Sequence, residues 1–443
     1  MQDSAPTGPI DVLRSLDEGG WNTFQKSVLV FAAMALAMDG IANQSLGLAV
    51  PSLVKAWNVA RSDFASVSAL NLVGVALGTL MGGLIGDRFG RRVGMIVSLA
   101  LFGVMTAAGA FATSPGELAG MRFLDGLGIG GAIPNGAAMI TEFTPIRRRS
   151  VAIAFSMAFI PVGGLLAGLL GATVLPDYGW QALFMICGAA TLVLAVVFIF
   201  VLPESPGYLL RQPHRKHELI RLLGRFGYGF SSDAEFAQEA RAGHTRMTAL
   251  FDKHIRLDTL ALWVGFFFCL MASYSLFSWV PTLLSTKGMD ARASSLGVTA
   301  FHLGGVIGGL VAGWVMQQLG SRGATIVFTG GGVAAAVGLA LLLSGGAVPS
   351  VAGLVLIAEG FFIAGVHTAV YTLAATAYPP FVRATGVGTA SAFGRLGAIL
   401  SSYTGISTIE GGGGFTFFLV VGCMLGLSGL ALVFMRKQLP KAA

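Results

Sequence analysis

Long apolar runs make up most of this chain, and short polar links separate them. A helix that spans a membrane needs ~20 mainly apolar residues. Twelve runs of that size occur, over about 27–50, 63–84, 93–112, 118–140, 150–172, 181–202, 260–283, 293–316, 323–344, 350–372, 385–407 and 414–435. A longer polar stretch divides them six and six. The pattern predicts an all-α membrane protein with twelve transmembrane helices in two pseudo-symmetric six-helix bundles.

The expected units follow from these runs. We expect an N-terminal tail over 1–26, an N-terminal bundle over 27–202, a central loop over 203–259, a C-terminal bundle over 260–435 and a tail over 436–443. The first apolar run lacks an early cleavage pattern, so we expect a permanent helix rather than a signal peptide.

Composition supports a bilayer as the natural solvent. Hydrophobic residues make up 54% of the chain and charged residues 11%, whereas soluble domains carry roughly 25% charged residues. The formal charge of +7 is spread over separate loops, which argues against a nucleic-acid partner. The three cysteines show no disulfide or metal spacing, so no metal is expected.

The basic residues of the loops predict the orientation. Links and tails on the side of the N-terminus carry 22 Lys and Arg, whereas the opposite links carry only Lys55, Arg61, Lys287 and Arg292. Basic loops stay in the cytoplasm. We therefore expect a multi-pass protein of a bacterial cell (inner) membrane with both termini in the cytoplasm.

An internal repeat indicates duplication of the bundle. Five positions in the link after the second run return 230 residues later: Gly83, Asp87, Arg88, Gly90 and Arg92 become Gly313, Gln317, Gln318, Gly320 and Arg322. A second pair, Pro145 and Arg149, returns as Pro379 and Arg383. Such internal repeats are typical of transporters.

Five charged residues fall inside the predicted spans: Asp39, Arg122, Asp125, Glu359 and Arg395. A charge at helix centre costs about 2.5–3.5 kcal/mol on insertion scales, so each should face a cavity or a partner. Arg122 and Asp125, three residues apart, either neutralise each other or exchange partners during transport. Asp39 either carries a proton or gates substrate, or it is a static hydrogen-bonded carboxylate.

Arg395 lies between Gly394 and Gly397, and its guanidinium fork matches a carboxylate. It either binds a substrate carboxylate or forms a permanent salt bridge to Asp39 or Glu359. Three intramembrane acids face two bases, so we expect one acid to hold a proton near neutral pH.

Polar and aromatic side chains near these charges are candidate pocket residues. Asn43 and Gln44 follow Asp39, and the others are His302, His367, Tyr274, Trp279, Tyr371 and Phe393. Each is also compatible with ordinary packing at a helix interface.

The segment Gly82–Arg92 resembles the loop 2–3 signature of the major facilitator superfamily. Further segments are similar to its aromatic acid:proton symporter branch: Asp39-Gly40, Arg122–Asn135, Thr141–Pro145 with Arg149, Pro203–Pro206, Trp279–Pro281 and Tyr378–Gly397. That branch imports benzoate-like, hydroxybenzoate-like and phenylpropanoid acids with protons. One departure is Ala42, where the branch usually has a second acid.

The resemblance and the residue pattern together assign candidate roles. Proton coupling falls to Asp39, Glu359, Asp125 and Glu142, and carboxylate binding to Arg395 and Arg122. A cytoplasmic gate is expected from Asp87, Arg88, Arg91, Arg92, Arg149 and Arg383.

We therefore predict a secondary active transporter that takes up an aromatic carboxylic acid with a proton by alternating access. It would work as a monomer with no cofactor besides the coupling proton, and its partners would be the acid and the bilayer. Alternatives are a proton-coupled porter for another organic anion, a sugar or an amphipathic drug, or a transporter-like sensor. The sequence shows no nucleophile triad and no phosphate-binding loop, so we do not expect an enzyme.

Overall fold

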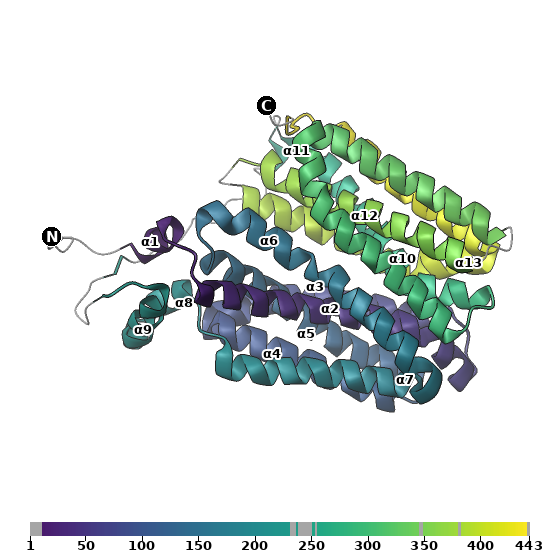
Figure 1. Ribbon diagram of the computed structural model, residues 1–443, viewed down its shortest axis with the longest axis horizontal. Helices are drawn as coiled ribbons and strands as arrows, with labels where there is room; N and C mark the ends of the chain where they lie inside the picture. Colours follow the sequence, from purple (N-terminus) through teal and green to yellow (C-terminus); the bar gives the residue numbers. More distant parts are fainter. Residues whose placement is uncertain are drawn as a thin grey trace.

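The computed structural model describes residues 11–230, 236–237, 250–252, 255–344, 349–379 and 382–440. Helices are the regular elements of these ranges (Figure 1). The long ones are α2 Thr23–Trp57, α3 Asp63–Phe89, α4 Arg91–Ala108, α5 Pro115–Glu142, α7 Phe159–Val201, α10 Arg256–Thr286, α11 Ala291–Ser344, α12 Pro349–Ala377 and α13 Arg383–Val433. A short helix, α6 Arg149–Met157, leads into α7.

Three of these helices are each two membrane spans. Their backbones leave helical geometry at Gly179 in α7, Gly320 in α11 and Gly413 in α13, with φ of 74°, 70° and 65°. Glycine adopts positive φ without steric cost, so the chain turns there into the next span. Within the described residues, eight helices are long and apolar enough to cross a membrane. With these three counted twice and the more polar α5 added, the predicted twelve spans are confirmed.

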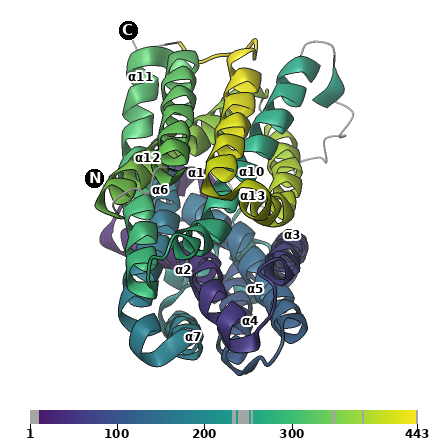
Figure 2. The ribbon, with the colours of Figure 1, turned by 90° about the vertical axis from the view of Figure 1, so that its right-hand side faces the viewer.

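The spans form two halves, α2 to α7 and α10 to α13. Seen end-on, the halves lie one above the other (Figure 2). In the first half, α3 and α4 pack on α5, and α2 and α4 pack on α7. In the second half, α11 packs on α12 and α10 on α13. The halves meet where α7 contacts α11, α2 contacts α10 and α3 contacts α13.

Small helices cover one end of the first half: α1 Val12–Glu18, α8 Pro206–Leu210 and α9 Lys216–Phe226, at the left of Figure 1. We call this the terminal end and the opposite one the distal end. Leu16 of α1 and Leu222 of α9 are buried in one cluster with Phe143 and Phe198. The expected tail and central loop thus contain structured elements, which belong to the first half.

Two spans begin earlier than their apolar runs predicted. Asn22 caps α2 in a reciprocal pair of hydrogen bonds with Gln25, so α2 begins at Thr23 rather than near residue 27. Such a capping box satisfies amide groups at the start of a helix. Helix α10 likewise begins at Arg256 rather than near 260.

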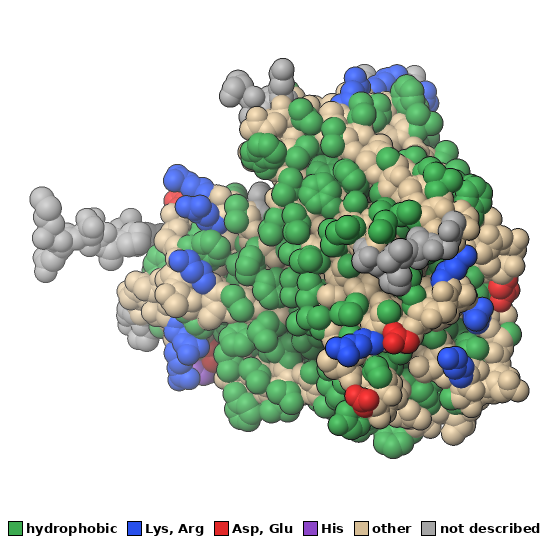
Figure 3. Space-filling view, turned by 45° about the vertical axis from the view of Figure 1, so that its right-hand side comes forward, with side chains coloured by type: hydrophobic (Ala, Val, Ile, Leu, Met, Phe, Trp, Pro, Cys, Tyr) green, Lys and Arg blue, Asp and Glu red, His purple; other side chains and the backbone are tan. Residues whose placement is uncertain are grey.

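The apolar core shows how the halves sit against each other. One buried cluster joins the second half to the distal part of the first, including Leu46, Phe64 and Phe184. The terminal part of the first half, around Met95 and Phe143, forms a separate cluster. The apolar core is therefore continuous across the halves at the distal end and divided at the terminal end. A band of hydrophobic side chains lies between two charged ends (Figure 3).

The sequence repeat is also a structural repeat. Gly90, with φ of 106°, separates α3 from α4, as Gly320 separates the two spans of α11. Arg92 donates to the carbonyl of Ile199, near the end of α7. Its counterpart Arg322 donates to the carbonyl of Met435, just after α13, at 3.4 Å. Each half thus ties its third span to the end of its sixth in the same way.

Candidate functional site

Asp39 and Arg395 lie on the two sides of the joint between the halves. Asp39 lies in the middle of α2 and Arg395 in the first span of α13, and each is half-buried. The Asp39 carboxylate accepts a hydrogen bond from Asn43 Nδ2 at 2.6 Å. Its charge interacts with that of Arg395, but no ion pair within 4.0 Å joins them. The sequence analysis allowed a permanent salt bridge from Arg395 to Asp39 or to Glu359. Neither salt bridge is found among the described residues.

Glycines set the position of Arg395. A Cβ atom on Gly397 would lie 2.2 Å from the carbonyl oxygen of Phe267, and one on Gly394 would lie 2.7 Å from Leu270. Only glycine permits so close an approach of two backbones. Helix α13 therefore packs directly on α10 here, and the guanidinium projects from this contact without a hydrogen bond to any described residue.

Aromatic side chains of the second half surround this region. Tyr274 lies close enough to Asp39 and Arg395 to feel both charges, and its ring is 5.6 Å from Phe277. Tyr371 packs edge-on against Phe266 at 4.9 Å. Aromatic edges and faces of this kind can hold a ring-shaped ligand.

Three further predicted pocket residues make their contacts within the second half. Phe393 stacks on Trp263 at 5.2 Å, and His367 Nε2 pairs with Ser273 Oγ at 3.0 Å. Trp279, by contrast, is 1% exposed and its ring lies against Gly405 of α13. The structure thus places Trp279 in the core of the second half, away from the predicted pocket, because α13 has no side chain at Gly405 to exclude it.

Arg122 and Asp125 form a buried ion pair inside the first half. Arg122 Nη1 donates to Asp125 Oδ2 at 2.7 Å, and Thr106 donates to the other carboxylate oxygen at 2.9 Å. The guanidinium also lies 4.5 Å from the ring of Phe184. The self-neutralising alternative of the sequence analysis is the one seen in this conformation.

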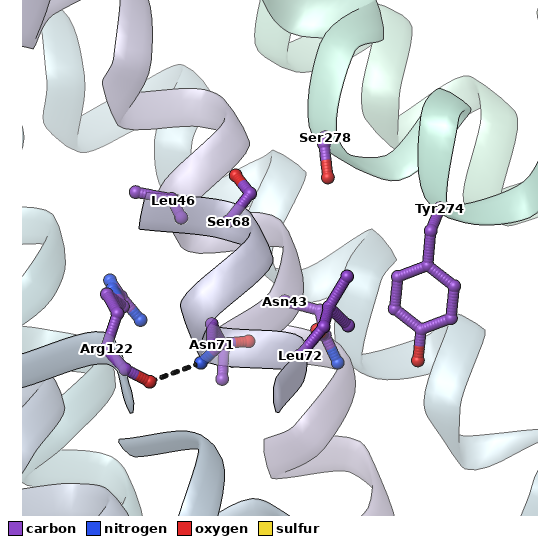
Figure 4. A pocket seen from close by; sticks show the side chains of 9 residues that line it. Asn43, Leu46, Ser68, Asn71, Leu72, Arg122, Tyr274 and Ser278 are labelled. Atoms are coloured by element: carbon purple, nitrogen blue, oxygen red, sulfur yellow. Dashed lines mark hydrogen bonds between the residues drawn. The ribbon is translucent and has the colours of Figure 1, made fainter. Parts of the chain in front are cut away.

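Arg122 nevertheless lines a small cavity between the halves (Figure 4). This cavity has a volume of about 20 Å³, which is room for about one water molecule. Asn71 on its wall donates to the Arg122 carbonyl at 2.8 Å. Across it stand Asn43 of α2 and Tyr274 of α10. Arg122 and the Asp39 region thus share one polar space, which is nearly filled.

Gln44 joins the two halves beside this space. Its side chain donates to the carbonyl of Phe277 at 3.1 Å and pairs with His302 Nε2 at 2.9 Å. His302 in turn stacks on Phe277 at 5.4 Å, and its ring fits only because Gly164 has no side chain. Among the described residues, these are the hydrogen bonds that cross between the halves.

Glu359 is buried at 0% exposure in α12. Neither of its carboxylate oxygens has a hydrogen-bond partner among the described residues. An ionised carboxylate without a partner is very costly in such a place. Glu359 lies apart from the Asp39 and Arg395 pair, in the interior of the second half.

The expected gate residues at the terminal end make contacts within their own half. Asp87 pairs with Arg91 at 2.5 Å, and Arg149 pairs with Asp17 near the end of α1 at 2.5 Å. Arg88 lies 5.4 Å from the ring of Phe89. Arg383 is exposed at the start of α13. No ion pair joins the two halves here among the described residues.

Two glutamates hold the α7–α8 link to the terminal end of the first half. Glu142 accepts hydrogen bonds from Ser205 Oγ at 2.5 Å and from the Gly207 amide at 2.8 Å. Glu142 therefore lies far along α5 from the central charges. Glu204 accepts from the amide groups of Arg92 at 3.2 Å and Ser205 at 2.9 Å.

Glu204 and Asp17 are functional candidates that residue patterns alone did not mark. Burial raises the pKa of Glu204, although its hydrogen bonds to backbone amides act in the opposite direction. The segment Pro203–Pro206 was a usable signal for Glu204. No local signal pointed to Asp17, since its partner lies 132 residues away.

Fold and site together define a membrane transporter with two halves around a central polar space. The sequence model of the Major Facilitator Superfamily matches residues 31–402 of this chain. The chain therefore belongs to this superfamily, and its family and fold are those of a transporter rather than an enzyme.

Known relatives narrow the class. The chain is 31% identical to a gallate transporter of Pseudomonas putida, over 98% of this chain and 93% of that one. It is 31% identical to a 4-hydroxybenzoate transporter of Pseudomonas putida, over 96% and 94% of the two chains. A partially occluded inward-open structure of the xylose transporter XylE from E. coli shares the fold, with a TM-score of 0.72 and 18% identity over 92% and 98% of the chains.

Proposed function

We propose that this chain imports an aromatic carboxylic acid together with a proton by alternating access. The observation that carries the proposal is Arg395, a half-buried cation at mid-span with no ion pair or hydrogen bond to a described residue. A charge inside the membrane is costly unless a partner or water compensates it. A ligand carboxylate would accept two parallel hydrogen bonds from the guanidinium fork.

The surroundings of Arg395 support an aromatic ligand over a neutral sugar. Tyr274 lies close enough to Arg395 to feel its charge, and Tyr371 lies close to Tyr274. The names of both relatives give gallate or 4-hydroxybenzoate as the substrate, and each of these acids has a benzene ring that carries a carboxylate. A sugar has no charge that would compensate Arg395.

For the coupling proton, the contacts favour Asp39 and Glu359 over Asp125 and Glu142. Asp125 is already paired with Arg122, and Glu142 with groups of the α7–α8 link. The negative charge of Asp39 acts on Arg395, so a proton on Asp39 would remove a charge that competes with the substrate carboxylate for the guanidinium. Glu359 has no partner that would stabilise its charge, so a carboxyl group there takes up a proton.

In this proposal the structure represents the state open to the terminal side. The basic residues of that side support a cytoplasmic location for it, and the proposal has the protein in the inner membrane of a bacterial cell, active as a monomer. Release of the acid and proton would be followed by closure at the terminal end. Asp87 and Arg383 lie at the two edges that would then meet.

Counterflow of labelled 4-hydroxybenzoate in proteoliposomes tests the proposal. Truncating one partner of a buried charge pair costs about 2–5 kcal/mol, so Arg395→Ala should raise the apparent KM by roughly 30-fold or more. Arg292→Ala, which removes an exposed distal charge, is the matched control. An Arg395→Ala variant with wild-type counterflow would overturn the substrate assignment.

A second arm tests proton coupling. Asp39→Asn should abolish uptake driven by a pH gradient while counterflow persists, because exchange needs no net proton movement. Uptake that still follows the pH gradient in both Asp39→Asn and Glu359→Gln would show that neither residue carries the proton.

A further inference from the structure

A second cavity lies at the distal end, where α2, α10 and the start of α11 meet. Its volume is about 150 Å³, and a cavity of about this volume holds benzene in another protein. Lys55 of α2 stands on its wall, 11 positions beyond Gln44, which is about 16 Å along a helix. The cavity therefore lies on the distal side of the Gln44, Phe277 and His302 contact.

The wall of this cavity carries an excess of positive charge. Lys55 and Arg61 both line it, and they are two of the only four basic residues in the distal links. Neither makes an ion pair within 4.0 Å with a described residue. The acid on the wall, Asp290, accepts a hydrogen bond from the Ala293 amide at 2.7 Å.

Buried hydroxyl groups without partners line the same cavity. Ser294 is 4% exposed and Ser295 is 0% exposed. Neither hydroxyl has a hydrogen-bond partner among the described residues. An unpaired buried hydroxyl is costly. A bound group that accepts hydrogen bonds from both serines would remove this cost. Pro51 and Pro281 add apolar surface of a size that suits a ring.

We propose that this cavity is an outer binding site for the carboxylate form of the aromatic acid, occupied while the distal end is closed. The cations would bind the carboxylate, the serine hydroxyls would donate to it, and the prolines would contact the ring. The site rests on the proposed function for the identity of its ligand. It would hold the acid at the distal face until the Gln44 contact opens.

The site belongs to the closed distal end, because its wall comes from both halves. Leu48, Ser52 and Lys55 come from α2, whereas Pro281, Ser285 and Ser294 come from α10 and α11. Opening of the distal end would separate these two sets and release the ligand toward the central space. The two cations also raise the local concentration of an anion, an effect that salt screens.

Thiol protection tests the site without any need for transport. Ser52→Cys is placed in a Cys423→Ser background, since Cys423 is the exposed cysteine while Cys187 and Cys269 are buried. A membrane-impermeant maleimide is added from the distal side, with increasing 4-hydroxybenzoate. We expect the acid to slow labelling, and Ser285→Cys from the facing half should report the same protection.

Variants of Lys55 and Arg61 test whether these two cations bind the carboxylate. Lys55→Ala and Arg61→Ala should each raise the half-protecting concentration by up to roughly fivefold, since a partly exposed ion pair contributes modestly. Lys287→Ala and Arg292→Ala, the other two distal cations, should leave it unchanged. Protection should weaken in high salt, and the neutral analogue 4-hydroxybenzyl alcohol should protect little.

The outcomes separate the site from the transport function. No protection of either cysteine, or equal effects of all four alanine variants, would overturn the site. Protection that appears only in vesicles with anionic lipid, with or without the acid, would assign the cavity to a lipid headgroup instead. Normal protection with no uptake of 4-hydroxybenzoate would support the site and refute the proposed substrate of transport.

Discussion

Gln44 is expected to hold the distal end closed, and its replacement by leucine should release it. Its two hydrogen bonds, to the Phe277 carbonyl at 3.1 Å and to His302 at 2.9 Å, are the ones that cross between the halves among the described residues. Each hydrogen bond contributes a net 0.5–1.5 kcal/mol, by order of magnitude. Gln44→Leu should therefore cost the closed state about 1–3 kcal/mol, which is a roughly 5- to 150-fold shift toward the distal-open state.

Distances between spin labels measure this shift. Labels on Ser52→Cys and Ser285→Cys, in a Cys423→Ser background, lie on facing walls of the distal cavity. Their separation should be short in the wild type and gain a longer component in Gln44→Leu. Ser428→Ala is the control, because it removes a buried hydrogen bond of 2.9 Å within the second half. An unchanged distance distribution in Gln44→Leu, or an equal change in Ser428→Ala, would refute the reasoning.

Two further predictions concern the terminal end of the first half. Gly90→Ala should destabilise the protein by about 1–3 kcal/mol, because Gly90 has φ of 106° and an added Cβ would lie 2.1 Å from the Glu204 carboxylate. Thermal unfolding in detergent measures this loss. Gly83→Ala is the control, because a Cβ at Gly83 meets open space. Burial raises the pKa of Glu204 in the folded protein, so protonation favours the folded state and this contribution fades as pH rises through the folded pKa. Glu204→Gln should therefore be stabilised relative to wild type more at pH 8 than at pH 5, and a difference that does not vary with pH would contradict this.

The sequence was sufficient for the architecture because the bilayer imposes simple requirements. A span needs a minimum apolar length, so twelve runs predicted twelve spans, and the duplicated link predicted two halves. The Arg122 and Asp125 pair was also within reach, since residues three apart lie on one face of a helix. These features depend on local spacing, which a sequence displays directly.

Other features depend on contacts between distant segments. Gln44 meets His302 across 258 positions, and Glu142 meets Ser205 across 63. Trp279 was expected in the pocket wall, yet it packs inside the second half because the facing residue is Gly405. Which end of the transporter is closed also cannot be read from a pattern, because the same sequence must be able to adopt both states.

The attachment of α9 to the first half has a practical consequence for imaging. Leu219, Leu222 and Leu223 anchor this helix in the terminal cluster, so it should move as one body with that half. A chain of 45.8 kDa with most of its mass in a detergent micelle offers little asymmetry for particle alignment in electron cryo-microscopy. A rigid helical fusion that continues α9 beyond Phe226 would supply an external marker. Its tilt against the second half would then report directly on the transport cycle.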